Sequence, residues 1–334
     1  MIDMRKFGLM VLARITGVRF DLISFLIFSF IYILLFWLSV DFYSRSMPLQ
    51  RQVLVSANTL GAESDESSNF TSIQEPILSE IATQPLIYAK SALVVDLGTG
   101  KALYQKNPED PVFPASTTKI ITAMVTLDSY DLDQTVIVSK ISVDGQKMGL
   151  KIGEKISVEN LLYGLLVYSA NDAAEALAAN YPGGRDIFIA AMNVKAKELG
   201  LSASLFTNPT GLDHMGQVTT ATDLVRASVV AMENPIFAKI VATKEITVNS
   251  IDGVYSHKLT NINKLLGVVD GVLGVKTGFT EEARENLVTY LERDGRKIML
   301  VLLGSSDRFG ETKKLIVWIF ENYHWGVAVG DVLP

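Results

Sequence analysis

The chain of 334 residues contains no cysteine and only three histidines, and both scarcities limit the chemistry open to it. Without cysteine there is no disulfide, no thiol nucleophile and no cysteine-ligated zinc site. His214, His257 and His324 are too far apart for the His-Glu-x-x-His pattern of zinc peptidases. We therefore expect no metal and no cofactor. None of the three histidines stands in a recognisable catalytic context.

Positive charge is also scarce. The chain has 30 lysines and arginines against 36 aspartates and glutamates, which gives a net charge of −6. Nucleic-acid-binding proteins normally present a basic face, so this balance argues against a nucleic-acid partner. Apolar residues make up 49% of the chain, and its length suffices for one or two domains with a sizeable core.

One long segment lacks charge altogether. Residues 22–40 form a run of nineteen uncharged residues rich in Phe, Leu and Ile. As a helix this run would be about 28 Å long, which matches the hydrocarbon core of a bilayer. A buried core helix would keep more polar positions, and a cleaved signal peptide would be followed by a clearer small-x-small site. The sequence therefore predicts an uncleaved transmembrane anchor.

Charge next to this run sets its expected orientation. Four basic residues precede it: Arg5, Lys6, Arg14 and Arg19. The positive-inside rule then makes residues 1–21 a cytoplasmic tail and predicts a single-pass protein of the cytoplasmic membrane, with residues 41–334 and their folded domain extracytoplasmic. Residues 41–85 are polar without a sustained period, which indicates a flexible stalk. Residues 327–334 are expected to form a short C-terminal tail.

Residues 86–326 show the regular patterns of a folded domain. Short apolar runs bounded by turn residues predict strands at 91–97, 101–105, 271–275, 287–291 and 297–303, the last two forming a hairpin around Asp294 and Gly295. Apolar residues at helical spacing predict helices at 116–127, 158–168, 172–180, 187–199 and 312–323. Strands at both ends with helices between them predict an α+β fold, in which helices flank one antiparallel sheet.

Three short motifs stand in order along this domain: Ser116-Thr-Thr-Lys119, Ser169-Ala-Asn171 and Lys276-Thr-Gly278. A serine hydroxyl is a weak nucleophile until a base takes its proton. Residues three apart on a helix share a face, so Lys119 can reach Ser116. An amine acts as a base only when it is neutral, a state that burial or a nearby cation favours. Lys276 could supply that cation and could also hold a substrate carboxylate.

The other motif residues fit the same scheme. Ser169 could relay a proton to the leaving group, and Asn171 could bind a substrate amide. Gly278 leaves room for an extended peptide beside the strand, and the backbone amides of Ser116 and Phe279 are the expected oxyanion donors. We predict as catalytic Ser116, Lys119 and Ser169, and as substrate-binding Asn171, Lys276, Thr277, Gly278 and Phe279. Each motif alone is common by chance, but their order and placement favour a serine acyl-transfer site.

With these motifs, the chain resembles the D-alanyl-D-alanine carboxypeptidases, the low-molecular-mass penicillin-binding proteins. The matching text includes Pro-Ala-Ser-Thr-Thr-Lys-Ile-Ile-Thr-Ala-Met at 114–124, and further stretches at 161–174, 206–212, 219–224 and 274–280. The resemblance covers roughly residues 88–325. It implies a β-lactamase/transpeptidase-like fold with a helical subdomain, an acyl-enzyme on Ser116 with Lys119 as base, and Lys276 bound to the substrate's terminal carboxylate. Implied partners are peptidoglycan stem peptides ending in D-Ala-D-Ala, and β-lactams as covalent inhibitors.

The chain departs from the family pattern at two positions. Arg284 stands where the family usually has a glycine, and Gln217 stands where it often has a histidine. Many relatives also carry a C-terminal β-rich domain with an amphipathic membrane helix. The sequence ends at Pro334 without either, so we expect membrane attachment through the N-terminal segment instead.

The resemblance implies a serine-type carboxypeptidase that removes the terminal D-alanine through a Ser116 acyl-enzyme, and three alternatives stay open. A DD-endopeptidase would cut peptidoglycan cross-links with the same residues. A serine β-lactamase is disfavoured, because no Glu-x-x-Leu-Asn stretch lies between Ala174 and Lys276. The third alternative is a catalytically inactive wall-binding scaffold of the same fold. The intact motifs argue against it, and Arg284 is the one feature in its favour.

Overall fold

The structure is a computed structural model that describes residues 75–326. The predicted cytoplasmic tail at 1–21, the predicted anchor at 22–40, residues 41–74 of the predicted stalk and the tail at 327–334 lie outside the described residues. Within residues 75–326, the helices are all too short or too polar to cross a bilayer. The anchor and the membrane location therefore stay predictions.

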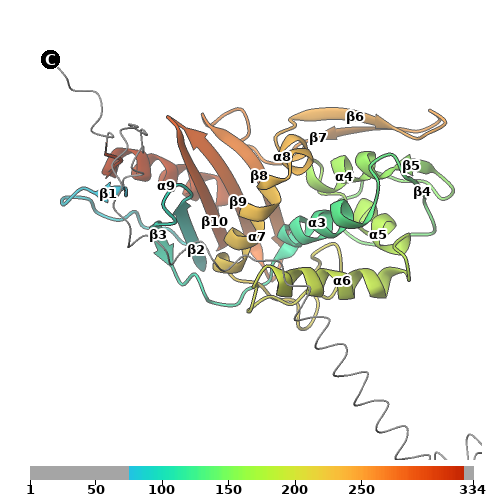
Figure 1. Cartoon of the computed structure of the whole chain (residues 1–334), viewed down its shortest axis with the longest axis horizontal. Helices are drawn as coiled ribbons and strands as arrows, with labels where there is room; N and C mark the ends of the chain where they lie inside the picture. The colour runs from blue at the N-terminus through green and yellow to red at the C-terminus, as the bar shows by residue number, and fades with distance from the viewer. Residues whose placement is uncertain (1–74, 327–334) are drawn as a thin grey trace, which may run out of the picture. The chain divides into compact units, whose positions relative to one another are not determined.

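A five-stranded antiparallel sheet lies at the centre of the described part (Figure 1), with strand order β3-β2-β10-β9-β8. Its strands are β2 (Ser91–Asp96), β3 (Ala102–Lys106), β8 (Val272–Thr280), β9 (Arg284–Arg293) and β10 (Arg296–Ser305). The register of β2 against β10 runs from Ser91 opposite Leu303 to Asp96 opposite Ile298. The two ends of the folded region thus build one sheet, as the strand pattern predicts.

Strand β10 shows why its sequence is apolar almost throughout. Met299, Val301 and Leu303 belong to one hydrophobic core, and the intervening Ile298, Leu300 and Leu302 belong to a second. Successive side chains of a strand point to opposite faces, so the sheet is covered on both sides. Helix α9 (Arg308–Asn322) packs on β9 and β10 from the side of the second core, and α7 (Ala221–Glu233) packs from the side of the first.

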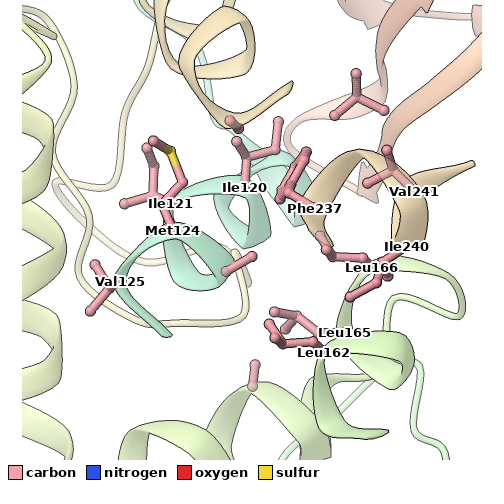
Figure 2. Packing of buried hydrophobic residues seen from close by; sticks show 14 of the residues in the cluster. Ile120, Ile121, Met124, Val125, Leu162, Leu165, Leu166, Phe237, Ile240 and Val241 are labelled. Carbon is pink, nitrogen blue, oxygen red and sulfur yellow. The ribbon is translucent and has the colours of Figure 1, made fainter. Parts of the chain in front are cut away.

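The first core continues into a helical subdomain beside the sheet. Its helices are α3 (Lys119–Ser129), α4 (Val158–Leu166), α5 (Asn171–Ala179), α6 (Arg185–Glu198) and α8 (Pro235–Val241). Figure 2 shows side chains of three of these helices packed together: Ile120, Ile121, Met124 and Val125 of α3, Leu162, Leu165 and Leu166 of α4, and Phe237, Ile240 and Val241 of α8. Burying each such side chain contributes about 1.5–3 kcal/mol. This packing fixes α3, whose first residue is Lys119.

Most predicted elements are confirmed, with shifts at their ends. The helices predicted at 158–168, 172–180 and 187–199 are α4, α5 and α6, and the predicted 287–291/297–303 hairpin is β9–β10. The helix expected from residue 116 begins with a 3₁₀ turn, η1 (Ala115–Thr118), and α9 begins before residue 312. Elements that the sequence analysis missed are α7, α8 and two short hairpins: β4 (Thr135–Ile137) with β5 (Lys155–Ser157), and β6 (Glu245–Asn249) with β7 (Ser256–Thr260).

Residues that precede position 86, the predicted start of the folded domain, make contacts with that domain. Strand β1 (Ile77–Leu78) pairs with β11 (Tyr323–His324) at the end of α9. The indole Nε1 of Trp318 also donates a 2.8 Å hydrogen bond to the carbonyl of Thr83. Part of residues 77–85, which the sequence analysis assigns to the stalk, therefore contacts α9 and β11, and the buried indole of Trp318 has its hydrogen-bond acceptor there.

Candidate active site

The three motifs meet in a cavity of about 400 Å³ where strand β8 faces the helical subdomain. Its lining residues are Ser116, Gly145, Gln146, Ser169, Asn171, Gly211, Leu212, Ile262, Lys264, Thr277, Gly278, Phe279, Thr280 and Arg308. Six of the eight predicted site residues are among them. The other two, Lys119 and Lys276, are 0% and 1% exposed and lie beneath the cavity wall. Segments more than 150 residues apart in sequence therefore supply one pocket.

Ser116 lies in η1, directly before α3. In a 3₁₀ turn, side chains three residues apart eclipse one another, and the Nζ of Lys119 lies 2.9 Å from the Oγ of Ser116. The preceding Ala115 has a φ of +48°, in the left-handed region that residues other than glycine rarely adopt. Such backbone strain concentrates at functional sites, where the surrounding structure enforces it.

Lys119 has two further hydrogen-bond partners, and both can only accept. Its Nζ lies 2.7 Å from the Oδ1 of Asn171 and 2.5 Å from the carbonyl oxygen of Thr210. Burial lowers the pKa of Lys119 to about 7, against the opposing effect of the Glu175 and Asp172 carboxylates. A neutral amine has two N–H groups and one lone pair. With both N–H groups on the two carbonyl acceptors, the lone pair faces the Ser116 hydroxyl.

Ser169 and Lys276 form a second serine–lysine pair. Ser169 is buried and has a φ of +63° just before α5, which directs its side chain toward the sheet. The Nζ of Lys276 donates hydrogen bonds to the Oγ of Ser169 at 2.8 Å and to the carbonyl of Thr277 at 3.0 Å. Burial holds the pKa of Lys276 well below its usual value, and the nearby Lys119 ammonium and Arg308 guanidinium lower it further. An anion in the cavity would favour the charged form of this lysine.

Asn171 begins α5 and joins several parts of the site. Its Oδ1 accepts from Lys119, and its Nδ2 donates a 2.7 Å hydrogen bond to the carbonyl of Asp144. Its backbone N–H donates to the carbonyl of Gln146. One hydrogen of the side-chain amide is therefore left to face the cavity.

Strand β8 forms one edge of the sheet and carries Thr277, Gly278 and Phe279 along the cavity. Among the described residues, β8 is paired on one side only, with β9. A Cβ on Gly278 would lie 3.1 Å from the backbone nitrogen of Ser116, so the strand passes close to the serine. The Oγ1 of Thr277 is buried and has no hydrogen-bond partner within residues 75–326. A buried unpaired hydroxyl in a cavity is available to a ligand.

Arg308 also lines the cavity, and the sequence analysis missed it. It is the first residue of α9, and burial lowers the pKa of its guanidinium, which still stays charged at neutral pH. Its Nη1 donates a 2.6 Å hydrogen bond to the carbonyl of Gly278, and its buried Nε has no partner in the described part of the chain. A single arginine 30 residues after the Lys-Thr-Gly motif gives no spacing signal.

Residues 206–217 form another wall that the motifs do not reveal. Gly211 has a φ of +87°, and a Cβ there would lie 1.9 Å from the carbonyl oxygen of Ala115, so only glycine fits. Gln217 is buried. Its Oε1 accepts from the backbone N–H of Thr207 and its Nε2 donates to the carbonyl of Leu212. The glutamine thus holds the wall in shape at the position where the family often has a histidine.

Arg284 and the histidines lie outside the cavity lining. Arg284 is exposed and stands opposite Thr280 where β9 begins, with a φ of +58°. This left-handed conformation explains the glycine usual at that position. His214 is exposed, and His257 is buried with contacts to Met148 and Glu154. Among the described residues no histidine lines the cavity, which agrees with the lack of a catalytic context for the histidines in the sequence.

Comparisons with known proteins agree with this geometry. Residues 79–307 match the D-alanyl-D-alanine carboxypeptidase family. The chain is 32% identical over 245 residues to the D-alanyl-D-alanine carboxypeptidase DacF of Bacillus subtilis, which covers 70% of this chain and 63% of DacF. It is 36% identical over 257 residues to the D-alanyl-D-alanine endopeptidase of Pseudomonas aeruginosa, covering 74% of this chain and 82% of that protein. The solved structure of the Streptomyces K15 DD-transpeptidase matches with a TM-score of 0.68 and 32% identity over 72% of this chain and all of its own.

Proposed function

The chain belongs to the D-alanyl-D-alanine carboxypeptidase family of serine peptidases, and we propose that it is a carboxypeptidase that removes the terminal D-alanine from peptidoglycan stem peptides. One observation carries this proposal. The amine of Lys119, with a pKa lowered to about 7, lies 2.9 Å from the Ser116 hydroxyl, and its other two partners only accept hydrogen bonds. That arrangement supplies an activated nucleophile without a histidine.

In the proposed acylation step, Lys119 takes the proton of Ser116 as its oxygen attacks the carbonyl before the terminal D-alanine. The backbone amides of Ser116 and Phe279 would stabilise the oxyanion, a role supported by the close approach of Gly278 to the Ser116 nitrogen. The C–N bond then breaks, leaving an ester on Ser116. Hydrolysis of this ester requires Lys119 to be neutral again. Its amine then takes a proton from water as the water oxygen attacks the ester, and returns that proton to the Ser116 oxygen as the ester bond breaks.

The leaving amine needs a proton, and we assign its delivery to Ser169. Its hydroxyl can give its proton to the departing nitrogen while Lys276, 2.8 Å away, replaces that proton. Acylation thus leaves the proton of Ser116 on Lys119 and leaves Lys276 neutral. Transfer of that proton from Lys119 to Lys276 through the cavity then restores both lysines before deacylation. Proton delivery to the leaving group requires a protonated Lys276, which the carboxylate of the bound peptide favours.

We assign the terminal carboxylate of the peptide to the cationic end of the cavity. Arg308 presents an unpartnered Nε there, and the Oγ1 of Thr277 has no partner among the described residues. Guanidinium and hydroxyl groups suit a planar carboxylate. Lys276, buried behind Ser169, would add charge from beneath. The peptide backbone would extend along the open edge of β8, and Asn171 would bind one of its amides.

Endopeptidase cleavage of cross-links is the second candidate, because the Pseudomonas aeruginosa and Escherichia coli relatives that are 36% and 35% identical to this chain are named endopeptidases. Both reactions would use the same acyl-enzyme. They differ in whether the leaving group is free D-alanine or a second stem peptide, so product analysis with a pentapeptide and with a cross-linked dimer distinguishes them.

We also propose that the catalytic domain acts outside the cytoplasmic membrane, tethered by residues 22–40. The uncharged run and the preceding basic residues support this location, as does a substrate that lies in the cell wall. Protease digestion of intact and of lysed cells tests the topology. Cleavage of residues 75–326 only after lysis would contradict it.

The decisive experiment treats the purified full-length chain with penicillin and follows its intact mass over time. We expect a long-lived adduct that maps to Ser116 and is absent from Ser116→Ala. An adduct on another residue would refute the assignment of the nucleophile. Clearance within seconds would indicate a β-lactamase, and no adduct at all would indicate an inactive scaffold. D-Alanine release from a pentapeptide then establishes the carboxypeptidase activity.

A further inference from the structure

A long connection forms part of the cavity wall. The chain between β4 and β5, residues 138–154, has no helix or strand of its own. Such long connections in a compact domain usually have a functional reason. Within it, residues 144–150, which we call the wall loop, bring Gly145 and Gln146 to the cavity. What fixes the wall loop therefore helps to determine the shape of the site.

The start of α5 holds the wall loop from the side of the cavity. Asn171 binds the carbonyls of Asp144 and Gln146, as described above. The carboxylate of Asp172 accepts hydrogen bonds from three consecutive backbone N–H groups of the wall loop, those of Met148, Gly149 and Leu150, at 3.0, 2.8 and 3.1 Å. Asn171 also accepts a hydrogen bond from Lys119, so a displacement of the wall loop would move a group that positions the Lys119 amine.

A second group of residues holds the same loop from the opposite side. The Nδ1 of His257, on β7, lies 3.1 Å from the carbonyl oxygen of Met148, and its Nε2 lies 2.7 Å from the Oε1 of Glu154. The other carboxylate oxygen of Glu154 accepts from the backbone N–H of Lys151 at 2.9 Å. His257 and Glu154 are both buried, at 7% and 2% exposure.

These contacts converge on the peptide unit that joins Met148 and Gly149. Its C=O is bound by His257 and its N–H by Asp172, so it is fixed from both sides. Both ring nitrogens of His257 face hydrogen-bond acceptors: Nδ1 faces the carbonyl of Met148, and Nε2 faces the carboxylate of Glu154. His257 and Glu154 therefore form a buried hydrogen-bonded pair, and loss of one partner would leave an unpaired polar group next to the wall loop.

We propose that His257 and Glu154 are positioning residues for the reaction. The pair fixes the Met148–Gly149 peptide and, through Asp172 and Asn171, keeps Lys119 in its alignment with Ser116. This inference rests on the proposed function of the Ser116 site. It assigns a role to a histidine that touches neither nucleophile nor base, and to a glutamate outside the three motifs.

The test uses full-length His257→Ala and Glu154→Gln. The second variant keeps the size of the side chain and an acceptor oxygen for the histidine, so it answers the question if the first does not fold. Leu300→Ala is the matched control, because Leu300 lies in the other core and its loss lowers stability without touching the wall loop. All are compared with the wild type, well below their melting temperatures, for the rate of penicillin acylation, for kcat and KM of D-alanine release, and for backbone hydrogen exchange of residues 148–150.

We expect His257→Ala to lose acylation rate by about tenfold or more, since small misplacements of reacting groups are costly. The loss should appear in kcat more than in KM, and Glu154→Gln should fall between this variant and the wild type. The amides of residues 148–150 should exchange faster in both variants and not in Leu300→Ala. Acylation at the wild-type rate, or a loss no greater than that of Leu300→Ala, would overturn the positioning role.

The wild-type reference separates the two claims. If wild-type Ser116 is not acylated, the proposed function fails, and the catalytic part of this inference fails with it, whatever the exchange data show. If the wild type is acylated and the variants match it, only the positioning role is lost.

Discussion

The Nη1 of Arg308 donates a 2.6 Å hydrogen bond to the carbonyl of Gly278, which joins the start of α9 to the Lys-Thr-Gly strand. This bond holds the guanidinium at the cavity and leaves its Nε without a partner among residues 75–326. Lys276 is buried behind Ser169, where its charged form is disfavoured until an anion binds. Together with Lys264, which also lines the cavity, Arg308 is therefore a cation that we expect an entering carboxylate to meet directly.

We expect Arg308→Leu to lower kcat/KM for D-alanine release from a pentapeptide by roughly 10–100-fold, because a hydrogen bond to a charged group contributes about 1.5–3 kcal/mol. Arg308→Lys should recover part of this loss, since it keeps the charge without the planar fork. The measurement compares a peptide ending in D-alanine with the same peptide ending in D-alanine amide. The wild type should discriminate strongly between them, and Arg308→Leu should not. Equal discrimination by the wild type and Arg308→Leu would show that Arg308 does not bind the terminal carboxylate of the peptide.

Lys119→Ala should lose penicillin acylation by at least ~10²-fold, the usual scale for a positioned base. In the wild type, the active form is the neutral amine. Because burial lowers the pKa of Lys119 to about 7, we expect the acylation rate to rise with pH through this value and to level off above it. Stopped-flow acylation between pH 5 and 9 checks both statements. Unchanged acylation in Lys119→Ala would refute the assignment of the base.

The pH at which the acylation rate rises should depend on the charge of Glu175 on α5. The Glu175 carboxylate raises the pKa of Lys119, so Glu175→Gln should move the rise of the acylation rate to lower pH. Glu175 is paired with Arg185 at 2.7 Å, and Arg185→Gln breaks the same salt bridge while keeping the carboxylate. In this control, the acylation rate should rise at the same pH as in the wild type or at a higher pH. A shift to lower pH in both variants would trace the effect to the broken salt bridge and not to the charge.

The strands and helices that build the site could be predicted because their patterns are local. Strand β10 is one apolar run because both of its faces are buried. Helix α4 is capped by Ser157, whose hydroxyl accepts from the backbone N–H of Asn160. The sequence carries capping signals of the same kind for α7 and α8. Thr220 and Asn234 cap the two helices, and Pro235 opens the second.

Other parts of the site follow only from the tertiary structure. The carbonyl of Thr210 carries no side-chain signature, yet it is one of the three groups around the amine of Lys119. Arg308 reaches the cavity because β10 and β9 bring α9 beside β8. The charge of Lys276 was expected from its residue type, whereas its burial beside Lys119 and Arg308 opposes that charge until an anion binds. None of these effects can be read from spacing along the chain.

Arg284 supplies the last prediction, because it has a left-handed backbone at a position where glycine is usual. A residue with a side chain in this conformation destabilises the folded state by about 1–2 kcal/mol, and glycine removes that strain. Glycine also loses more chain entropy on folding, which offsets about 0.5–1 kcal/mol of the gain. Arg284→Gly should therefore raise the melting temperature by about 1–4 °C. Arg284→Ala keeps the Cβ and removes the guanidinium, so it should give no gain.

Catalysis should respond differently from stability at this position. Arg284 is exposed and does not line the cavity, so we expect both variants to be acylated by penicillin within about twofold of the wild type, as for a surface change that leaves the reacting groups in place. Thermal unfolding and acylation kinetics of the same preparations check this. An acylation rate that rises tenfold in Arg284→Gly but not in Arg284→Ala would mean that the arginine distorts the end of β8, and that this chain is an attenuated member of its family.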